Sequence, residues 1–350
     1  MTIENLIISW YQKNKRDLPW RKTRDPYKIW ISEIILQQTR VDQGLSYYYN
    51  FLKNFPDVKT LANAKEEEVL KIWQGLGYYS RARNLHFSAK YIENELDGVF
   101  PASYPELKKL KGVGDYTAAA IASFAYNEKV PLVDGNVYRL FSRLYAESTP
   151  IDTTNGKKIF YAIASELLQN KEAEVFNQAI MEFGALQCKP KPNCTDCILN
   201  HKCQAFKMKV VDKFPIKSNK LTSKKRYFNY LIVETNESIY LHKRNGNDIW
   251  KGLYELPLIE SASKISLANL CETPEWNGFF GEQKLLIDTN FDPILHKLTH
   301  QQLYVNFYHI MLKEKHQNLT LSGNFILVPI NEIENYPVPK LIENHLLSTF

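Results

Sequence analysis

Residues 110–134 read LKGVGDYTAAAIASFAYNEKVPLVD, and this stretch is the most informative part of the chain. Gly112 and Gly114 flank a valine in a short turn, which leads directly into an alanine-rich run typical of a buried helix. We expect both glycines to adopt positive φ, which costs glycine nothing and lets the backbone approach a ligand closely. The free N–H groups at the start of the following helix favour an anion.

A Gly-x-Gly turn alone also fits an ordinary connection between two helices. Leu110 before the turn, and Tyr116, Thr117 and the alanines after it, favour a more specific motif, the helix-hairpin-helix. Such a hairpin would bind DNA phosphate and would position the protein without reading the bases.

Asp134 closes the stretch, and Gly135, Asn136 and apolar residues at helical spacing follow it. An aspartate directly before a helix is most often an N-cap. Because an N-cap carboxylate is held ionised, it can also stabilise a neighbouring cation, so capping and catalysis are compatible. Asp134 is therefore a candidate catalytic residue.

A second candidate acid, Glu33, lies in the stretch WISEIILQQT at residues 30–39. Apolar neighbours would desolvate its carboxyl group and raise its pKa toward the range of a general acid. The simpler alternative is a solvated position on a helix. Gln37, Gln38 and Thr39 follow, and they offer amide and hydroxyl groups suited to base edges.

Residues 75–83 read GLGYYSRAR, a glycine-hinged segment with two tyrosines and two arginines. It fits a loop that packs its tyrosines on a core. It also fits a wedge with phosphate clamps at Arg81 and Arg83, as enzymes that extrude bases require.

Four of the five cysteines are clustered in a Cys-x5-Cys-x2-Cys-x5-Cys pattern, at Cys188, Cys194, Cys197 and Cys203. Four thiolates this close suit tetrahedral zinc or an iron–sulfur cluster, and thiolates alone do not distinguish the two. An odd total clustered in this way argues against a disulfide framework. We expect a structural site, because no cofactor motif lies nearby.

The chain has 350 residues, which suffices for two domains, and its 44% hydrophobic content is ordinary for a soluble globular protein. The net charge of +6 suits a polyanionic partner without requiring one. Neither a run of about eighteen apolar residues nor a signal peptide is recognisable, so we expect a cytoplasmic protein without a membrane span.

The pattern of apolar and charged residues divides the chain into three segments. Residues 1–211 predict helix after helix, whereas residues 227–350 show the alternation of strands in a mixed α/β domain. Between them, residues 212–226 are rich in lysine and poor in apolar residues, which predicts a basic linker. The linker is either simply solvated or a tether along DNA phosphates. The clearest strands span 227–233, 238–244 and 302–310.

Together these motifs resemble the endonuclease III superfamily of DNA glycosylases, and within it the MutY family of adenine DNA glycosylases. The stretch DIWKGLYELP at residues 248–257 is similar to the family's C-terminal Nudix-like domain. The resemblance covers nearly the whole chain. It implies an all-α helix-hairpin-helix glycosylase domain with an iron–sulfur cluster loop at 1–211. An α/β Nudix-like domain that recognises 8-oxoguanine would follow the linker at 227–350.

The resemblance also implies an activity: monofunctional removal of adenine mispaired with 8-oxoguanine or guanine in double-stranded DNA, within base excision repair. Glu33 would protonate the flipped adenine. Asp134, helped by Tyr116 and Asn136, would stabilise an oxocarbenium-like sugar, which is the general logic of glycoside hydrolysis. The four cysteines would hold a [4Fe-4S] cluster. We expect a monomer associated with the bacterial nucleoid.

Further residues match binding positions of the family. Trp20, Arg21 and Glu182 would line the adenine pocket. The residues around 8-oxoguanine and the opened base stack would be Gln38, Thr39, Leu76 and Tyr78. Gly112 and Gly114 would bind phosphate, and Thr299 and His300 would contact 8-oxoguanine.

The sequence departs from the family pattern at four places. The segment between the first two cysteines is one residue shorter than usual, and Lys111 stands where proline is common. The Phe-Ser-His signature for 8-oxoguanine reads Leu298-Thr299-His300, which keeps a hydroxyl and an imidazole but loses the aromatic ring. The acidic cluster of Nudix hydrolases is absent near residues 256–261, so we expect that domain to recognise DNA and not to hydrolyse nucleotides.

Two alternatives predict different behaviour. A glycosylase-lyase for oxidised pyrimidines needs a lysine that forms a Schiff base with the sugar, and Tyr116 occupies that position. A non-enzymatic iron–sulfur module that binds DNA would need the hairpin and the cysteines. It would need neither Glu33, nor Asp134, nor the Gln-Gln-Thr block.

Overall fold

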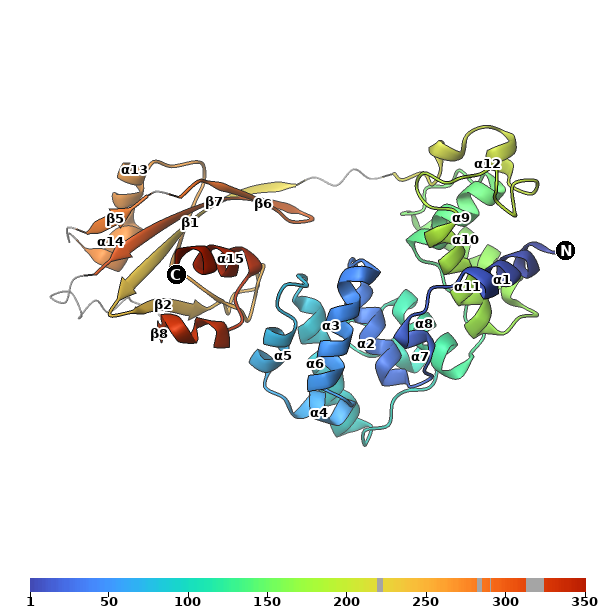
Figure 1. Ribbon diagram of the computed structural model, residues 1–350, viewed down its shortest axis with the longest axis horizontal. Coiled ribbons are helices and arrows are strands. Elements are labelled where there is room, and N and C mark those ends of the chain that lie inside the picture. The colour runs from blue at the N-terminus through green and yellow to red at the C-terminus, as the bar shows by residue number, and fades with distance from the viewer. Residues whose placement is uncertain (219–222, 282–284, 290, 313–323) are drawn as a thin grey trace. The chain divides into compact units, whose positions relative to one another are not determined.

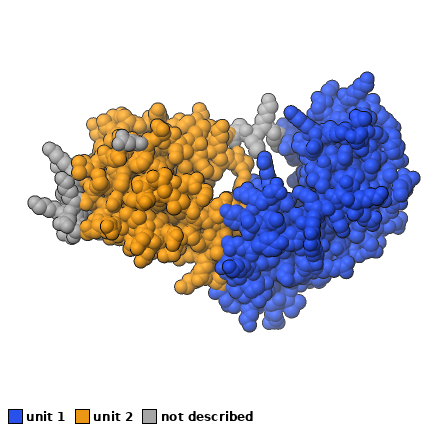
Figure 2. All heavy atoms as spheres, in the orientation of Figure 1, with its two compact units in different colours: residues 1–63, 84–220 blue, residues 64–83, 221–350 orange. Residues whose placement is uncertain are grey.

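The computed structural model describes residues 1–218, 223–281, 285–289, 291–312 and 324–350. Residues 219–222, in the middle of the predicted linker, lie outside the described residues. The chain divides into two compact units, residues 1–63 with 84–220 and residues 64–83 with 221–350 (Figure 2). The predicted all-α domain followed by a Nudix-like α/β domain is confirmed as the fold class, whereas the exact domain boundaries stay a prediction.

The first unit is helical throughout its described length (Figure 1). Its N-terminal part contains α1 (Ile3–Asn14), the 3-10 turn η1 (Pro19–Arg21), α2 (Pro26–Leu36), α3 (Val41–Asn54), α4 (Val58–Asn63) and most of α6 (Ser80–Glu95). Its later part contains α7 (Tyr104–Leu107), α8 (Asp115–Tyr126), α9 (Gly135–Tyr145), α10 (Thr154–Leu168), α11 (Ala173–Leu186), α12 (Gln204–Lys207) and η2 (Val211–Lys213).

Helices α1, α9, α10 and α11 enclose one apolar core. Phe141, Phe160, Phe176 and Phe183 are fully buried in it. Burying one such side chain stabilises a fold by about 1.5–3 kcal/mol. Since α9 and α11 also carry predicted site residues, this packing holds those residues on rigid elements.

The hairpin before α8 differs from the prediction in one detail. Gly112 has φ +83°, as expected, but Gly114 is the N-cap of α8 with φ −89°, a conformation open to any residue. A Cβ atom on Gly112 would lie 2.7 Å from Cβ of Asn84 on α6. Gly112 is therefore required both by its backbone conformation and by the close approach of α6, whereas Gly114 is not required by conformation.

In its described residues, the second unit is built on one eight-stranded sheet (Figure 1). Its strands are β1 (Lys224–Thr235), β2 (Ser238–Lys243), β3 (Tyr254–Glu255), β4 (Leu258–Ser261), β5 (Leu286–Asp288), β6 (Ile294–Lys297), β7 (Gln301–Met311) and β8 (Phe325–Pro329). The helices are α5 (Glu66–Ile72), α13 (Leu267–Cys271), α14 (Pro274–Phe280), η4 (Ile330–Asn335) and α15 (Lys340–Thr349).

Strands β1 and β7 form the centre of this sheet. They run parallel from Lys224 opposite Gln301 to Glu234 opposite Met311, and the other strand pairs are antiparallel. Two apolar clusters form, one that includes α15 and one that includes α13 and α14. The three predicted strands are confirmed in β1, β2 and β7. Within the described residues, no helix combines the length and apolarity needed to cross a membrane.

Candidate active site

One cavity of the first unit collects most of the residues predicted for the active site. Helices α2, α8, α9 and α11 and the turn η1 contribute to its wall. The predicted residues that line it are Trp20, Arg21, Glu33, Thr39, Tyr116, Asp134, Asn136 and Glu182. Residues distant in the sequence thus line one common cavity.

Glu33 lies on α2 and is 5% exposed. Burial raises the pKa of its carboxyl group to about 7, and the charge of Asp134 acts in the same direction. A hydrogen bond with Tyr116 and the charge of Arg21 favour the ionised form and offset part of this effect. The carboxyl group of Glu33 therefore titrates near neutral pH. The rise in its pKa is the direction expected from its apolar neighbours.

Asp134 is the N-cap of α9. Its Oδ1 accepts hydrogen bonds from the backbone N–H groups of Asn136 at 3.0 Å and Val137 at 2.8 Å, and its Oδ2 accepts one from Asn136 Nδ2 at 2.7 Å. Burial nevertheless raises its pKa above the ordinary value of an aspartate, against the lowering effect of these bonds. The N-cap prediction is confirmed, but capping does not outweigh burial.

The amide of Asn136 is held in one orientation. Its Oδ1 accepts a hydrogen bond from Arg139 Nη2 at 2.8 Å, so its Nδ2 points toward Asp134. Arg139 is itself fixed by donating to the carbonyl oxygens of Gly184 and Cys188, each at 2.7 Å. The contacts of Asp134 therefore depend on residues well outside the Asp-Gly-Asn motif.

The pKa of Glu182, on α11, is shifted in the opposite direction. This glutamate is 1% exposed, and its oxygens accept hydrogen bonds from the guanidinium groups of Arg16, at 2.6 and 3.0 Å, and Arg21, at 2.7 and 2.8 Å. Although burial disfavours its charge, these bonds lower the pKa of Glu182 to about 2. One wall of the cavity therefore holds a permanent ion pair.

Two of the predicted binding residues follow the end of α2. Thr39 lines the cavity, whereas Gln38 is exposed outside it and has φ +59°. Gln37, which was singled out only as part of the triplet, donates from Nε2 to Oγ1 of Thr117 at 3.1 Å. The three residues thus have different surroundings: Gln37 contacts α8, Gln38 faces solvent and Thr39 lines the cavity.

The loop between α5 and α6 belongs to the second unit. Leu76 is 7% exposed, but Tyr78 is 45% exposed and has φ +47°, a conformation that tyrosine rarely adopts. Phosphate clamps at Arg81 and Arg83 stay a prediction, although both side chains bond to the protein itself. Arg81 is 8% exposed and donates to the carbonyl oxygens of Leu76 and Gly77, and Arg83 donates to a backbone carbonyl oxygen as well.

Thr299 and His300 form the exposed loop of the hairpin between β6 and β7. The hydroxyl groups of Thr299 and Tyr78 are hydrogen-bonded within the second unit. Leu298, which replaces the aromatic residue of the family signature, packs against the apolar cluster that includes α15. The structure therefore brings one predicted wedge residue next to one predicted 8-oxoguanine contact.

All four clustered cysteines line a second cavity of the first unit. Burial raises the pKa of the thiols of Cys194 and Cys203, and that of Cys197 to about 11. Among the described residues, no three metal-binding side chains converge as a single ion would require. Four thiols that line one cavity are a donor set that suits either tetrahedral zinc or an iron–sulfur cluster.

The chain matches two family models. The first, for the HhH-GPD superfamily of base excision DNA repair proteins, covers residues 31–169. The second, for the NUDIX domain, covers residues 229–347. An adenine DNA glycosylase from Buchnera aphidicola (Acyrthosiphon pisum) is 33% identical over 99% of this chain and 98% of its own length. The chain belongs to the adenine DNA glycosylase family. It is therefore a DNA glycosylase.

Other relatives match parts of the chain. Human adenine DNA glycosylase is 40% identical over 57% of this chain and 38% of its own length. Among solved structures, a thermostable thymine-DNA glycosylase has a TM-score of 0.55 at 29% identity, covering 59% of this chain and 95% of its own. A non-covalent endonuclease III–DNA complex, at 0.50 and 21% over 59% and 94%, shows the shared fold.

Sequence reasoning missed three residues of these sites. Arg16 and Gln178 line the first cavity, and Arg16 is a second partner of Glu182. Helical spacing could have found Gln178, since it lies four residues before Glu182 on α11. Arg143 is 3% exposed and donates to carbonyl oxygens of the cysteine loop, including that of Lys189 at 2.8 Å. A lone arginine on an apolar helix face was its only signal.

Proposed function

We propose that this DNA glycosylase hydrolyses the N-glycosidic bond of adenine mispaired with 8-oxoguanine, or with guanine, in duplex DNA. The observation that carries the proposal is the shared cavity of Glu33, Tyr116, Asp134 and Asn136. This is the set that hydrolysis of a glycosidic bond requires, namely a proton donor beside a second carboxyl group.

Glu33 would act as the general acid. With a pKa of about 7, a large share of the carboxyl groups carry a proton at neutral pH, unlike those of an ordinary glutamate. A proton delivered to the ring of an extruded adenine turns the base into a neutral leaving group. The hydroxyl of Tyr116, which hydrogen-bonds Glu33, orients the carboxyl group for this transfer.

Asp134 would stabilise the positive charge that develops on the sugar as the base departs. Its carboxyl group is fixed by the backbone of α9 and by Asn136, so it does not reorganise during the reaction. The ion pair of Glu182 with Arg21 would supply a fixed polar wall that recognises the edge of adenine.

The arrangement favours a monofunctional mechanism, in which water and not an amine attacks the sugar. Among the described residues that line the cavity there is no lysine, and Tyr116 is phenolic. Burial and the neighbouring acids raise the pKa of Tyr116 well above its ordinary value, so it stays protonated and is a poor nucleophile.

The four cysteines would hold a [4Fe-4S] cluster, which supplies a structural cross-link for the loop between α11 and α12. Arg143 holds this loop by donating to Lys189 and Pro190 at 2.8 and 3.0 Å. In the second unit, Thr299 and His300 would contact 8-oxoguanine in the opposite strand. Gly112 and the N-terminus of α8 would bind DNA phosphate.

Base release from duplexes tests the proposal. We expect single-turnover adenine release to be fastest opposite 8-oxoguanine, slower opposite guanine, and undetectable for thymine opposite guanine. Borohydride should trap little covalent protein–DNA adduct. Release of thymine in place of adenine, or strong borohydride trapping, would overturn the substrate or the mechanism respectively.

A further inference from the structure

The hairpin loop that carries Thr299 and His300 has an unusual backbone for its length. Leu298 and Gln301 close it, with the N–H of Leu298 donating to the carbonyl oxygen of Gln301 at 2.8 Å. The favoured two-residue hairpin loops require positive φ at their first residue. Neither Thr299 nor His300 has positive φ.

The same sheet contains a matched contrast. The loop between β1 and β2 consists of Asn236 and Glu237, with φ +47° and +54°, as the favoured loop type requires. That loop is specified by its own backbone. The loop of Thr299 and His300 lacks this local specification, so its position depends more on contacts from outside.

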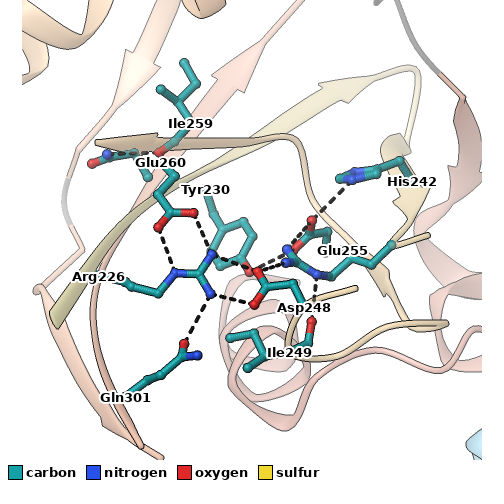
Figure 3. Close-up of polar contacts among 11 residues, drawn as sticks. Arg226, Tyr230, His242, Asp248, Ile249, Glu255, Ile259, Glu260 and Gln301 are labelled. Atoms are coloured by element: carbon teal, nitrogen blue, oxygen red, sulfur yellow. Dashed lines mark hydrogen bonds and ion pairs between the residues drawn. The ribbon is translucent and has the colours of Figure 1, made fainter. Parts of the chain in front are cut away.

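One such contact comes from a buried arginine. Arg226, on β1, is 9% exposed, and its Nη1 donates to Oε1 of Gln301 at 3.1 Å (Figure 3). Nearby, the backbone N–H of Lys224 donates to the carbonyl oxygen of His300 at 3.0 Å. The start of β1 therefore holds the loop both through its backbone and through the side chain of Gln301.

Arg226 is itself immobilised by two carboxylates (Figure 3). Asp248 accepts from its Nη1 and Nη2, each at 2.8 Å, and Glu260 accepts from its Nε at 2.7 Å and its Nη2 at 2.6 Å. The guanidinium also lies 4.7 Å from the ring centroid of Phe228. With its plane fixed on two sides, the direction in which Nη1 meets Gln301 is fixed as well.

The network continues through Arg244, which shares Asp248 with Arg226 and also binds Glu255, at 2.8 and 2.6 Å respectively. Asp248 and Glu255 flank the Trp250–Tyr254 turn. Arg226 thus connects Asp248, at one end of this turn, with Gln301, which closes the loop predicted to contact 8-oxoguanine (Figure 3).

We propose that Gln301 and Arg226 are positioning residues for recognition of 8-oxoguanine. They hold the loop of Thr299 and His300 in the position from which its hydroxyl and imidazole groups contact the base. This inference rests on the proposed function, because it assigns those two residues to the base opposite adenine. It adds the contact through which the rest of the second unit controls them.

Gln301→Leu tests the contact, since it removes the acceptor of Arg226 and leaves the ion pairs with Asp248 and Glu260. We expect the preference for adenine opposite 8-oxoguanine over adenine opposite guanine, measured at subsaturating protein, to fall about three- to tenfold. The rate constant at saturating protein should not change, because the catalytic cavity lies in the first unit. Gln301→Glu keeps an acceptor oxygen and should restore the preference.

Gln302→Leu is the matched control, because neighbouring residues of a strand point to opposite faces. Amide hydrogen exchange of residues 298–301 supplies a readout independent of activity, and it should accelerate in Gln301→Leu only. An unchanged preference and exchange rate in Gln301→Leu would overturn the inference. So would an equal loss in Gln302→Leu. Failure of the proposed function would instead appear in the unmodified protein, as a lack of preference for 8-oxoguanine.

Discussion

The cavity of the first unit and the charged network of the second unit surround their carboxyl groups in opposite ways. In the cavity, Glu33 forms no ion pair with any residue that the structure describes, and burial raises its pKa to about 7. In the network, the side chain of Asp248 is 34% exposed, and although partial desolvation acts against its charge, Arg226 and Arg244 lower its pKa. The first arrangement keeps a proton available for transfer, and the second keeps charges fixed for support.

This difference distinguishes carboxyl groups suited to chemistry from carboxylates that support the fold. A buried carboxyl group without a counterion costs stability, which is expected at sites that do chemistry. A carboxylate with two guanidinium partners is inert to pH near neutrality. Glu182 shows that both types coexist in one cavity, since its two arginines lower its pKa to about 2.

The largest expected effect comes from Glu33→Gln. Loss of the general acid should reduce single-turnover adenine release by about 10²- to 10⁴-fold. In the unmodified protein the rate should be constant well below pH 7 and should fall above it, because the protonated form of Glu33 is the active one. The variant should lose this pH dependence. The control is Glu174→Gln, at a surface pair with Arg24, which should behave like the unmodified protein. An unaltered rate in Glu33→Gln would show that Glu33 is not the general acid.

Asp134→Asn should have the next largest effect. The substitution removes the charge that stabilises the sugar cation, and we expect a loss of about 10²- to 10³-fold in the same assay. Asparagine keeps an acceptor oxygen for the start of α9, so thermal unfolding should change little. A large drop in thermal stability with a retained rate would show that the residue acts as a cap alone.

Arg226→Met should have the smallest effect on catalysis and a measurable one on stability. It leaves Glu260 and part of Asp248 without a partner, and both are partly exposed, so we expect a cost of about 2 kcal/mol in the free energy of unfolding. Urea unfolding followed by circular dichroism measures this cost. Adenine release at saturating protein should stay intact. A variant with the same free energy of unfolding as the unmodified protein would show that the network does not stabilise the second unit.

Much of the fold was predictable because its signals are local. Residue pattern predicted α8 and α9, and alternation predicted β1, β2 and β7. The expectation for Gly114 was wrong, because a Gly-x-Gly turn needs positive φ at only one of its glycines here. The carbonyl oxygens that accept hydrogen bonds from Arg81 and Arg83 were not predicted. Carbonyl acceptors supplied by the fold compete for an arginine, and a sequence does not show them.

By itself, the sequence determined the succession of a helical segment and a strand-containing segment, the N-cap at Asp134 and the candidate acids, since these depend on neighbours within a few residues. Only the tertiary structure decided which carboxyl group meets a cation and which does not. Glu33 and Glu182 are both glutamates on apolar helices, yet burial sets the pKa of one and Arg16 and Arg21 set that of the other. Desolvation and ion pairing are properties of the packed space around a group, and residues far apart in the chain create that space.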